Sequence, residues 1–155
     1  MITDWVDNAD APKRIMWLNG PAGAGKSAIA QSIADHYKDS HLAASFFFQR
    51  NNPDRGVADL SLAWQLAFSI PETRPYIESA LKKEPLLHTK TIEVQFSRLI
   101  MDIFESLLRD KPGLHPKKPL VIIDGVDECA NEQRQKNFLT LIGNEISLRK
   151  ISLRF

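Results

Sequence analysis

The sequence predicts an α/β fold in which helices cover a parallel β-sheet. Short apolar runs stand at residues 15–19, 43–48 and 120–124, and each suits a strand buried on both faces. Helical apolar periodicity separates these runs, as it does where parallel strands are joined by crossover helices. The length of 155 residues favours a single domain over residues 1–155. A binding site is then expected beyond the carboxyl ends of the strands.

The first strand is expected at residues 15–19, IMWLN, after a lead-in of residues 1–14. It ends at Gly20, where a loop of glycine and alanine begins. A helix follows the loop, with apolar positions at Ile29, Ile33 and Tyr37. The second strand, residues 43–48, and the turn-forming residues after it complete a first unit of residues 15–56.

Residues 57–118 are expected to form a helical insert and a closing loop rich in proline and lysine. The first helix of the insert has apolar positions at Leu60, Trp64 and Ala67. Pro71 or Pro75 can open a second helix. The clearest amphipathic helix of the chain follows, with apolar positions at Ile92, Phe96, Leu99, Ile103 and Leu107. We expect the three tryptophans to pack in the core or at its margin, at Trp5, Trp17 and Trp64.

The last part of the chain, residues 119–155, begins with the third strand, LVIID, at 120–124. This strand ends in Asp124, and a helix is expected over residues 132–148. The residues ISLRF, 151–155, have the pattern of the beginning of another strand.

Composition excludes several classes of protein. Twenty Lys and Arg residues against nineteen Asp and Glu residues leave a net charge of +1, so no bulk field attracts nucleic acid or an acidic membrane. One cysteine, Cys129, permits no internal disulfide, which fits a reducing compartment. We find no secretory leader and no apolar run of membrane-spanning length, and we expect a soluble, cytoplasmic domain.

A phosphate-binding loop is predicted between the first strand and the helix after it. The residues match G-x-x-x-x-G-K-[ST], in which successive backbone N–H groups surround a phosphate and large side chains would obstruct its approach. Lys26 supplies a positive charge to the β- and γ-phosphates, and the Ser27 hydroxyl can ligate Mg²⁺. The helix adds the positive end of its dipole. The expected nucleotide-binding residues are Gly20, Pro21, Ala22, Gly23, Ala24, Gly25, Lys26, Ser27 and Ala28.

The alternative is a glycine-rich turn that joins a strand to a helix and binds nothing. The apolar run before the loop and the helical pattern after it are the context that phosphate binding requires, so they favour the first interpretation. We therefore expect ATP or ADP together with Mg²⁺ as the bound cofactors.

An acidic segment follows the third strand. A carboxylate at the end of a buried strand is costly unless a cation faces it, so Asp124 is expected to bind magnesium directly or through water. Glu128, or alternatively Asp127, can orient and deprotonate an attacking water, with Lys26 as the third catalytic candidate. The other interpretation is that Asp127 and Glu128 only cap the next helix.

The segments WLNGPAGAGKSAIAQSIAD, ASFFFQR and PLVIIDGVDEC together resemble the fungal NACHT NTPases. These proteins belong to the STAND class of P-loop NTPases, are similar to NOD-like receptors, and include the nephrocystin-3-like N-terminal domains. The resemblance implies a three-layer αβα fold with a parallel sheet in the order 2-3-4-1 and a helical insert before the acidic strand. It places residues 151–155 between the acidic strand and the strand of residues 15–19.

Compared with the family, the chain resembles a NACHT core that is shortened at both ends. The fifth strand, the lid helices and the Ser/Thr-Arg sensor pair have no counterpart in the sequence, so residues 15–19 are expected to form an apolar sheet edge. The family's function implies an ATP/ADP-dependent signalling switch, with weak or absent hydrolysis in this form. Other copies of the chain or longer NACHT relatives are the expected protein partners.

Two other functions stay open at this point. A small P-loop kinase acting on a metabolite would require the acidic strand to lie directly beside the phosphate-loop strand. A non-enzymatic NACHT fragment would use its exposed sheet edge to dock on a longer relative.

Overall fold

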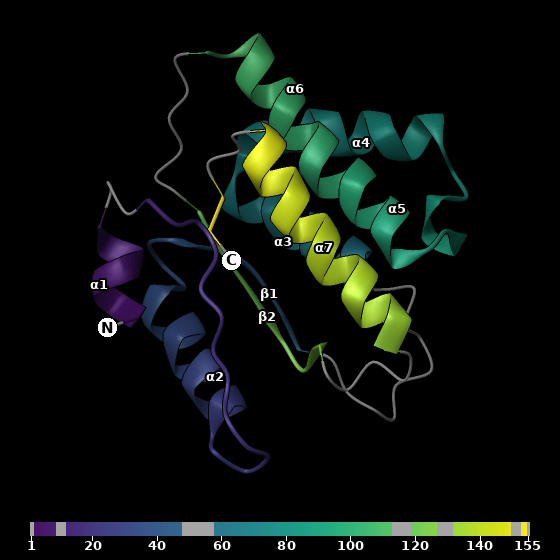
Figure 1. The fold of residues 1–155 in the computed structure, drawn as a ribbon. Coiled ribbons are helices and arrows are strands. Elements are labelled where there is room, and N and C mark those ends of the chain that lie inside the picture. Colours follow the sequence, from purple (N-terminus) through teal and green to yellow (C-terminus); the bar gives the residue numbers. More distant parts are fainter. Residues whose placement is uncertain are drawn as a thin grey trace.

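A computed structural model describes residues 2–8, 12–47, 58–112, 119–126, 132–149 and 153–154. Helices predominate, and a small parallel sheet lies between two helical layers (Figure 1). None of the helices in the described ranges has the length and apolar character that a membrane span requires. The predicted α/β class is therefore confirmed, with more helix than sheet.

The sheet consists of β1, Leu42–Phe47, and β2, Leu120–Asp124, which pair in parallel. The register joins Leu42 to Leu120 and Phe47 to Asp124, with an irregularity between Leu42 and Ala44. Both strands are short and apolar and lie within one residue of the positions that the sequence predicts. Their carboxyl ends therefore meet at the same edge of the sheet.

Alternation along β2 divides its side chains between two faces of the sheet. Leu120 and Ile122 pack with α1, Ile2–Asp7, and α2, Lys26–Tyr37. The intervening Val121 and Ile123 pack into the larger core on the opposite face. This core contains residues from α3, Ala58–Ser69, α5, Ile92–Phe96, and α7, Glu132–Arg149. Helices thus pack against both faces of the sheet, which is compatible with the layered fold that the family resemblance implies.

The helical insert is continuous with the larger core. After α3, a 3-10 turn at Pro71–Thr73 leads into α4, Arg74–Lys83, with Pro75 in its first turn. From α5 a π-helical segment, Ser97–Met101, runs into α6, Asp102–Asp110. The buried face of this run holds Phe96, Leu99, Ile103 and Leu107, as the periodicity predicts. The predicted helix at 132–148 is confirmed as α7.

The predicted strand at residues 15–19 is wrong. The segment joins α1 to α2 without strand pairing, as a purple trace in Figure 1, and most of it is exposed. Trp17 is 59% exposed, and Trp64 on α3 is 67% exposed, so neither packs in the core, which leaves the margin of the core as the other predicted position. An apolar run forms a strand only where a neighbouring backbone offers hydrogen bonds, and no described residue does so here.

The predicted strand order is supported only in its central part. Beyond the pairing of β1 with β2, Arg154 forms a parallel bridge with Leu120 on the other edge of β2. Its N–H donates to Pro119 O at 2.9 Å, and its carbonyl accepts from Val121 N–H at 2.7 Å. No described residue continues this pairing along β2. The order 2-3-4-1 is therefore not confirmed, because the first predicted strand does not join the sheet.

The raised pKa of Tyr37 predicts that the stability of the folded protein decreases at high pH. The Tyr37 hydroxyl donates to Asp7 Oδ1 at 2.9 Å, and burial followed by the nearby Asp7 raises the pKa of Tyr37 from 10.0 to about 12. Between these two values the unfolded chain loses the proton and the folded chain keeps it, so stability falls as pH rises through this window. Urea unfolding from pH 9 to 12 measures the effect. Tyr37→Phe should have a shallower decline than the wild type, and equal slopes would contradict the assignment.

Candidate functional site

The predicted phosphate loop forms a compact turn that ends in α2. Gly23 and Gly25 both have a φ of 79°, in the left-handed region, and Gly25 is the residue that precedes the helix. Ala24 N–H donates to Pro21 O at 3.2 Å, which closes the turn. Residues 20–25 are exposed, so a ligand can approach the backbone directly.

The conformation of Gly25 predicts the effect of adding a side chain. A Cβ atom at this position meets no atom within 4 Å, but the positive φ disfavours any L residue with a Cβ atom. Gly25→Ala is therefore expected to lower the free energy of unfolding by about 1–2 kcal/mol. Gly143→Ala in α7 is the matched control, because helical alanine is favoured over glycine by about 1 kcal/mol. Urea unfolding should give opposite signs for the two variants, and equal signs would contradict the strain at Gly25.

Lys26 is the first residue of α2, and its side chain turns back into the loop. Its Nζ donates to Gly20 O at 2.8 Å and to Pro21 O at 3.1 Å. The ammonium group therefore contacts carbonyl oxygens of the turn. The glycines of the same turn leave its backbone accessible. An anionic ligand in the turn would offer stronger, charged acceptors to this group.

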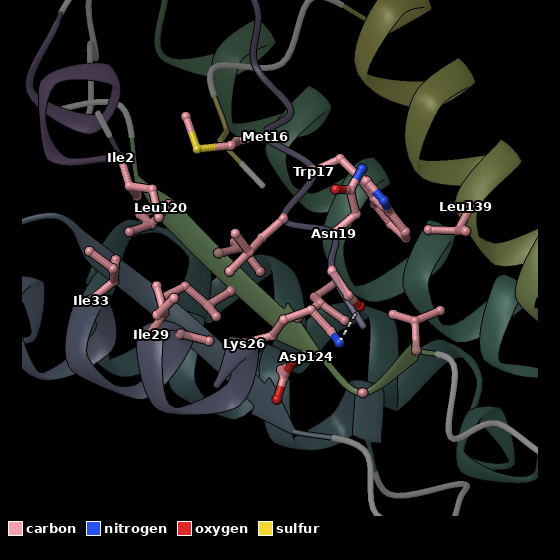
Figure 2. Close-up of a pocket in the computed structure, with 18 of the residues that line it drawn as sticks. Ile2, Met16, Trp17, Asn19, Lys26, Ile29, Ile33, Leu120, Asp124 and Leu139 are labelled. Atoms are coloured by element: carbon pink, nitrogen blue, oxygen red, sulfur yellow. Dashed lines mark hydrogen bonds between the residues drawn. The ribbon is translucent and has the colours of Figure 1, made fainter. Parts of the chain in front are cut away.

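Asp124 ends β2 on the face of the sheet that α2 covers. The alternation that places Leu120 and Ile122 against α1 and α2 places Asp124 on the same side. Asp124 and Lys26 also line one cavity of about 360 Å³, shown in Figure 2. The predicted acidic residue and the predicted phosphate-loop lysine are therefore brought to the same pocket.

The pocket has a polar end and an apolar end. The polar end, beside the loop, is lined by Asn19, Gly20, Lys26 and Asp124. Figure 2 shows Asn19, Lys26 and Asp124 at this end. The remaining wall comes from α1, residues 16–18, α2, β2 with the two residues after it, and α7, and its members include Ile2, Trp5, Ile29, Ile33, Leu120 and Leu139. The contributions of α1 and of Gln135 and Leu139 from α7 were not predicted. The helical pattern at 132–148 indicates an inner face, but no local motif indicates that this face reaches a pocket.

Few of the described side chains near the loop could bind a magnesium ion. The described residues contain no group of three or more His, Cys, Asp or Glu side chains that could hold a metal without help. The hydroxyl of Ser27 is on an exposed residue, and Asp124 is half-buried. This set suits Mg²⁺, which commonly takes one or two protein ligands and fills its other positions with phosphate oxygens and water. The predicted catalytic residues Asp127 and Glu128 lie outside the described residues.

The family described as nephrocystin 3, N-terminal, matches residues 1–155. The chain belongs to this family. The nephrocystin 3 N-terminal match includes the predicted phosphate loop, the helical insert and the strand that ends in Asp124, so the predicted family resemblance is confirmed.

A curated relative supports the same family assignment. The vegetative incompatibility protein HET-E-1 of Podospora anserina is 31% identical over 142 residues, which covers 84% of this chain. This match agrees with the resemblance to fungal proteins that the motifs predict. The chain spans about a tenth of the length of that relative, 10%. No solved structure gave a significant match.

Proposed function

We propose that this nephrocystin 3 N-terminal domain binds ATP or ADP with Mg²⁺ and acts as a nucleotide-dependent switch in a signalling protein. The phosphates would lie in the turn of residues 20–25 against the N-terminus of α2. Lys26 would supply the positive charge, while Ser27 and Asp124 would hold the metal directly or through water.

The observation that carries this proposal is the meeting of Lys26 and Asp124 at one pocket. The two residues stand 98 positions apart in sequence (124 − 26), yet both line the cavity in Figure 2. A cationic loop with an exposed backbone and a carboxylate on a nearby strand is the combination that a metal-bound nucleotide uses. The family assignment supports the switch, because the resemblance to NACHT proteins extends over the whole chain.

The described geometry gives less support to a small kinase. That alternative requires the acidic strand to pair directly with the phosphate-loop strand. Instead, β2 pairs with β1 on one side, and Arg154 bridges its other side. Hydrolysis needs a group that orients water, and we keep Glu128 and Asp127 as the expected candidates for this role.

Calorimetric titration of the full chain with ATP and with ADP, each with and without Mg²⁺, tests the proposal. Binding in the micromolar range supports it. Affinity of millimolar or weaker for both nucleotides would contradict it. GTP in a parallel titration shows whether the base contributes to the affinity.

Asp124→Asn should remove the part of the ATP affinity that depends on magnesium. The amide keeps the shape of the carboxylate but loses the charge that attracts the ion. Interactions with charged groups contribute about 1.5–3 kcal/mol, and we expect a loss of this size. The ratio of ATP affinities with and without Mg²⁺ should therefore fall about tenfold or more. Asp102→Asn on α6 is the matched control and should keep the wild-type ratio. An unchanged ratio in Asp124→Asn would show that this carboxylate does not hold the metal.

A further inference from the structure

Arg154 is a buried charge at the edge of the sheet. Only 1% of its surface is exposed, and burial lowers the pKa of its guanidinium group from the ordinary value. The group remains charged, because arginine is not deprotonated in proteins. Removing such a charge from water costs several kcal/mol, so its position requires strong compensating contacts.

The compensating contacts come from the C-terminal end of α1. The Arg154 guanidinium donates to the carbonyl oxygens of Trp5, Val6 and Asn8, and the bond to Val6 O is 2.6 Å long. Trp5 and Val6 lie in the last turn of the helix, where carbonyl groups lack helical partners and carry the negative end of the dipole. The same guanidinium lies over the indole ring of Trp5, 5.2 Å from its centroid.

The N-terminal helix α1 has other contacts besides those with Arg154, among them a hydrogen bond that Trp5 Nε1 donates to Lys13 O at 2.9 Å. Val6 is buried in a small cluster with Tyr37 and Leu120, separate from the main core. The Tyr37 hydroxyl adds its bond to Asp7 and a longer one of 3.3 Å to Thr3 O. A helix of six residues is marginal in isolation, so it depends on such contacts for its order.

We propose that Arg154 is the residue that positions α1, and that it thereby couples the edge of β2 to the N-terminal helix. Its backbone pairs with Pro119 and Val121 beside β2, while its side chain holds the end of α1. Residues near the two ends of the chain are thus joined through one side chain.

The coupling affects the pocket, because α1 forms part of its wall. Ile2 and Trp5 line the apolar end of the cavity whose polar end contains Lys26. Release of α1 would open that end and expose the small cluster around Leu120 to solvent. This inference goes beyond nucleotide binding and does not depend on it.

Tryptophan fluorescence of the full chain tests the proposal. Trp17→Phe and Trp64→Phe replace two exposed residues and leave Trp5 as the single reporter of the three tryptophans. In this background, Arg154→Met should shift the Trp5 emission to longer wavelength and raise its acrylamide quenching constant at least twofold. The far-UV circular dichroism of the remaining helices should stay close to that of the parent.

Three further variants separate positioning from general stability. Arg154→Lys keeps one cationic donor and should restore part of the parent emission. Tyr37→Phe removes only the hydroxyl contacts and should have a smaller effect than Arg154→Met. Arg74 forms an ion pair on α4, and its side chain is 70% exposed, so Arg74→Met should not change the Trp5 emission.

Three results would overturn the proposal. The first is unchanged emission and quenching in Arg154→Met, which would mean that the apolar cluster holds α1 without the arginine. The second is loss of the whole circular dichroism signal in that variant, which would make Arg154 a general core residue. A Tyr37→Phe effect as large as that of Arg154→Met would also contradict it.

Discussion

Replacement of Lys26 by alanine is expected to weaken ATP binding about 10- to 100-fold. The Nζ atom now donates to Gly20 O and Pro21 O within the loop, and a phosphate would replace these neutral acceptors with charged ones. Hydrogen bonds to charged groups contribute about 1.5–3 kcal/mol, and each 1.4 kcal/mol changes affinity about tenfold. Calorimetric titration at fixed Mg²⁺ and ionic strength measures the change.

Lys82→Ala is the matched control for this variant. Lys82 is an exposed lysine on α4, which belongs to the helical insert and does not line the pocket. Its replacement changes the net charge by the same amount and should leave the affinity within about twofold, since exposed charges are screened by salt. Equal losses in both variants would mean that overall charge, and not the loop, determines ATP binding.

Phe96→Ala is expected to lower the free energy of unfolding by about 3–5 kcal/mol, the range for a buried phenylalanine. Phe96 is completely buried at the end of α5. Its ring meets that of Phe138 on α7 edge to face, with centroids 5.4 Å apart and planes at 82°. Removing the ring leaves a cavity between the insert and α7, which urea unfolding detects as a lower midpoint.

Phe68→Ala provides the comparison for the same change of side chain at an exposed site. Phe68 is 68% exposed on α3 and contacts Trp64, which is exposed as well. We expect a loss below about 1 kcal/mol, as for most surface substitutions. A Phe96→Ala effect no larger than that of Phe68→Ala would contradict the position of the core between α5 and α7.

The sequence predicts most elements that have a strong local pattern. The apolar positions Phe96, Leu99, Ile103 and Leu107 form one buried helical face, as their spacing predicts, and the apolar run at 120–124 forms a strand. The turn at residues 20–25 is predictable because two of its glycines adopt the positive φ that other residues disfavour, while phosphate binding by this turn stays a prediction. In each case the residues that determine the structure are close together in the chain.

The remaining features depend on partners that are distant in sequence. Residues 15–19 have the composition of a strand but lack a described backbone partner, so composition alone predicts a pairing that is absent. The buried position of Arg154 is equally unpredictable, because its acceptors belong to α1, more than 140 residues earlier. Neither the pocket wall from α1 nor that from α7 has a local motif.

The most direct test of the central claim is an experimental structure of the chain with Mg²⁺ and a non-hydrolysable ATP analogue. The account predicts the β- and γ-phosphates within the loop of residues 20–25, with Lys26 Nζ moved from Gly20 O to a phosphate oxygen. It also predicts one magnesium ion between Ser27 and Asp124, bound directly or through a single water. A nucleotide bound elsewhere, or an Asp124 carboxylate too distant to reach that ion through one water, would contradict the account.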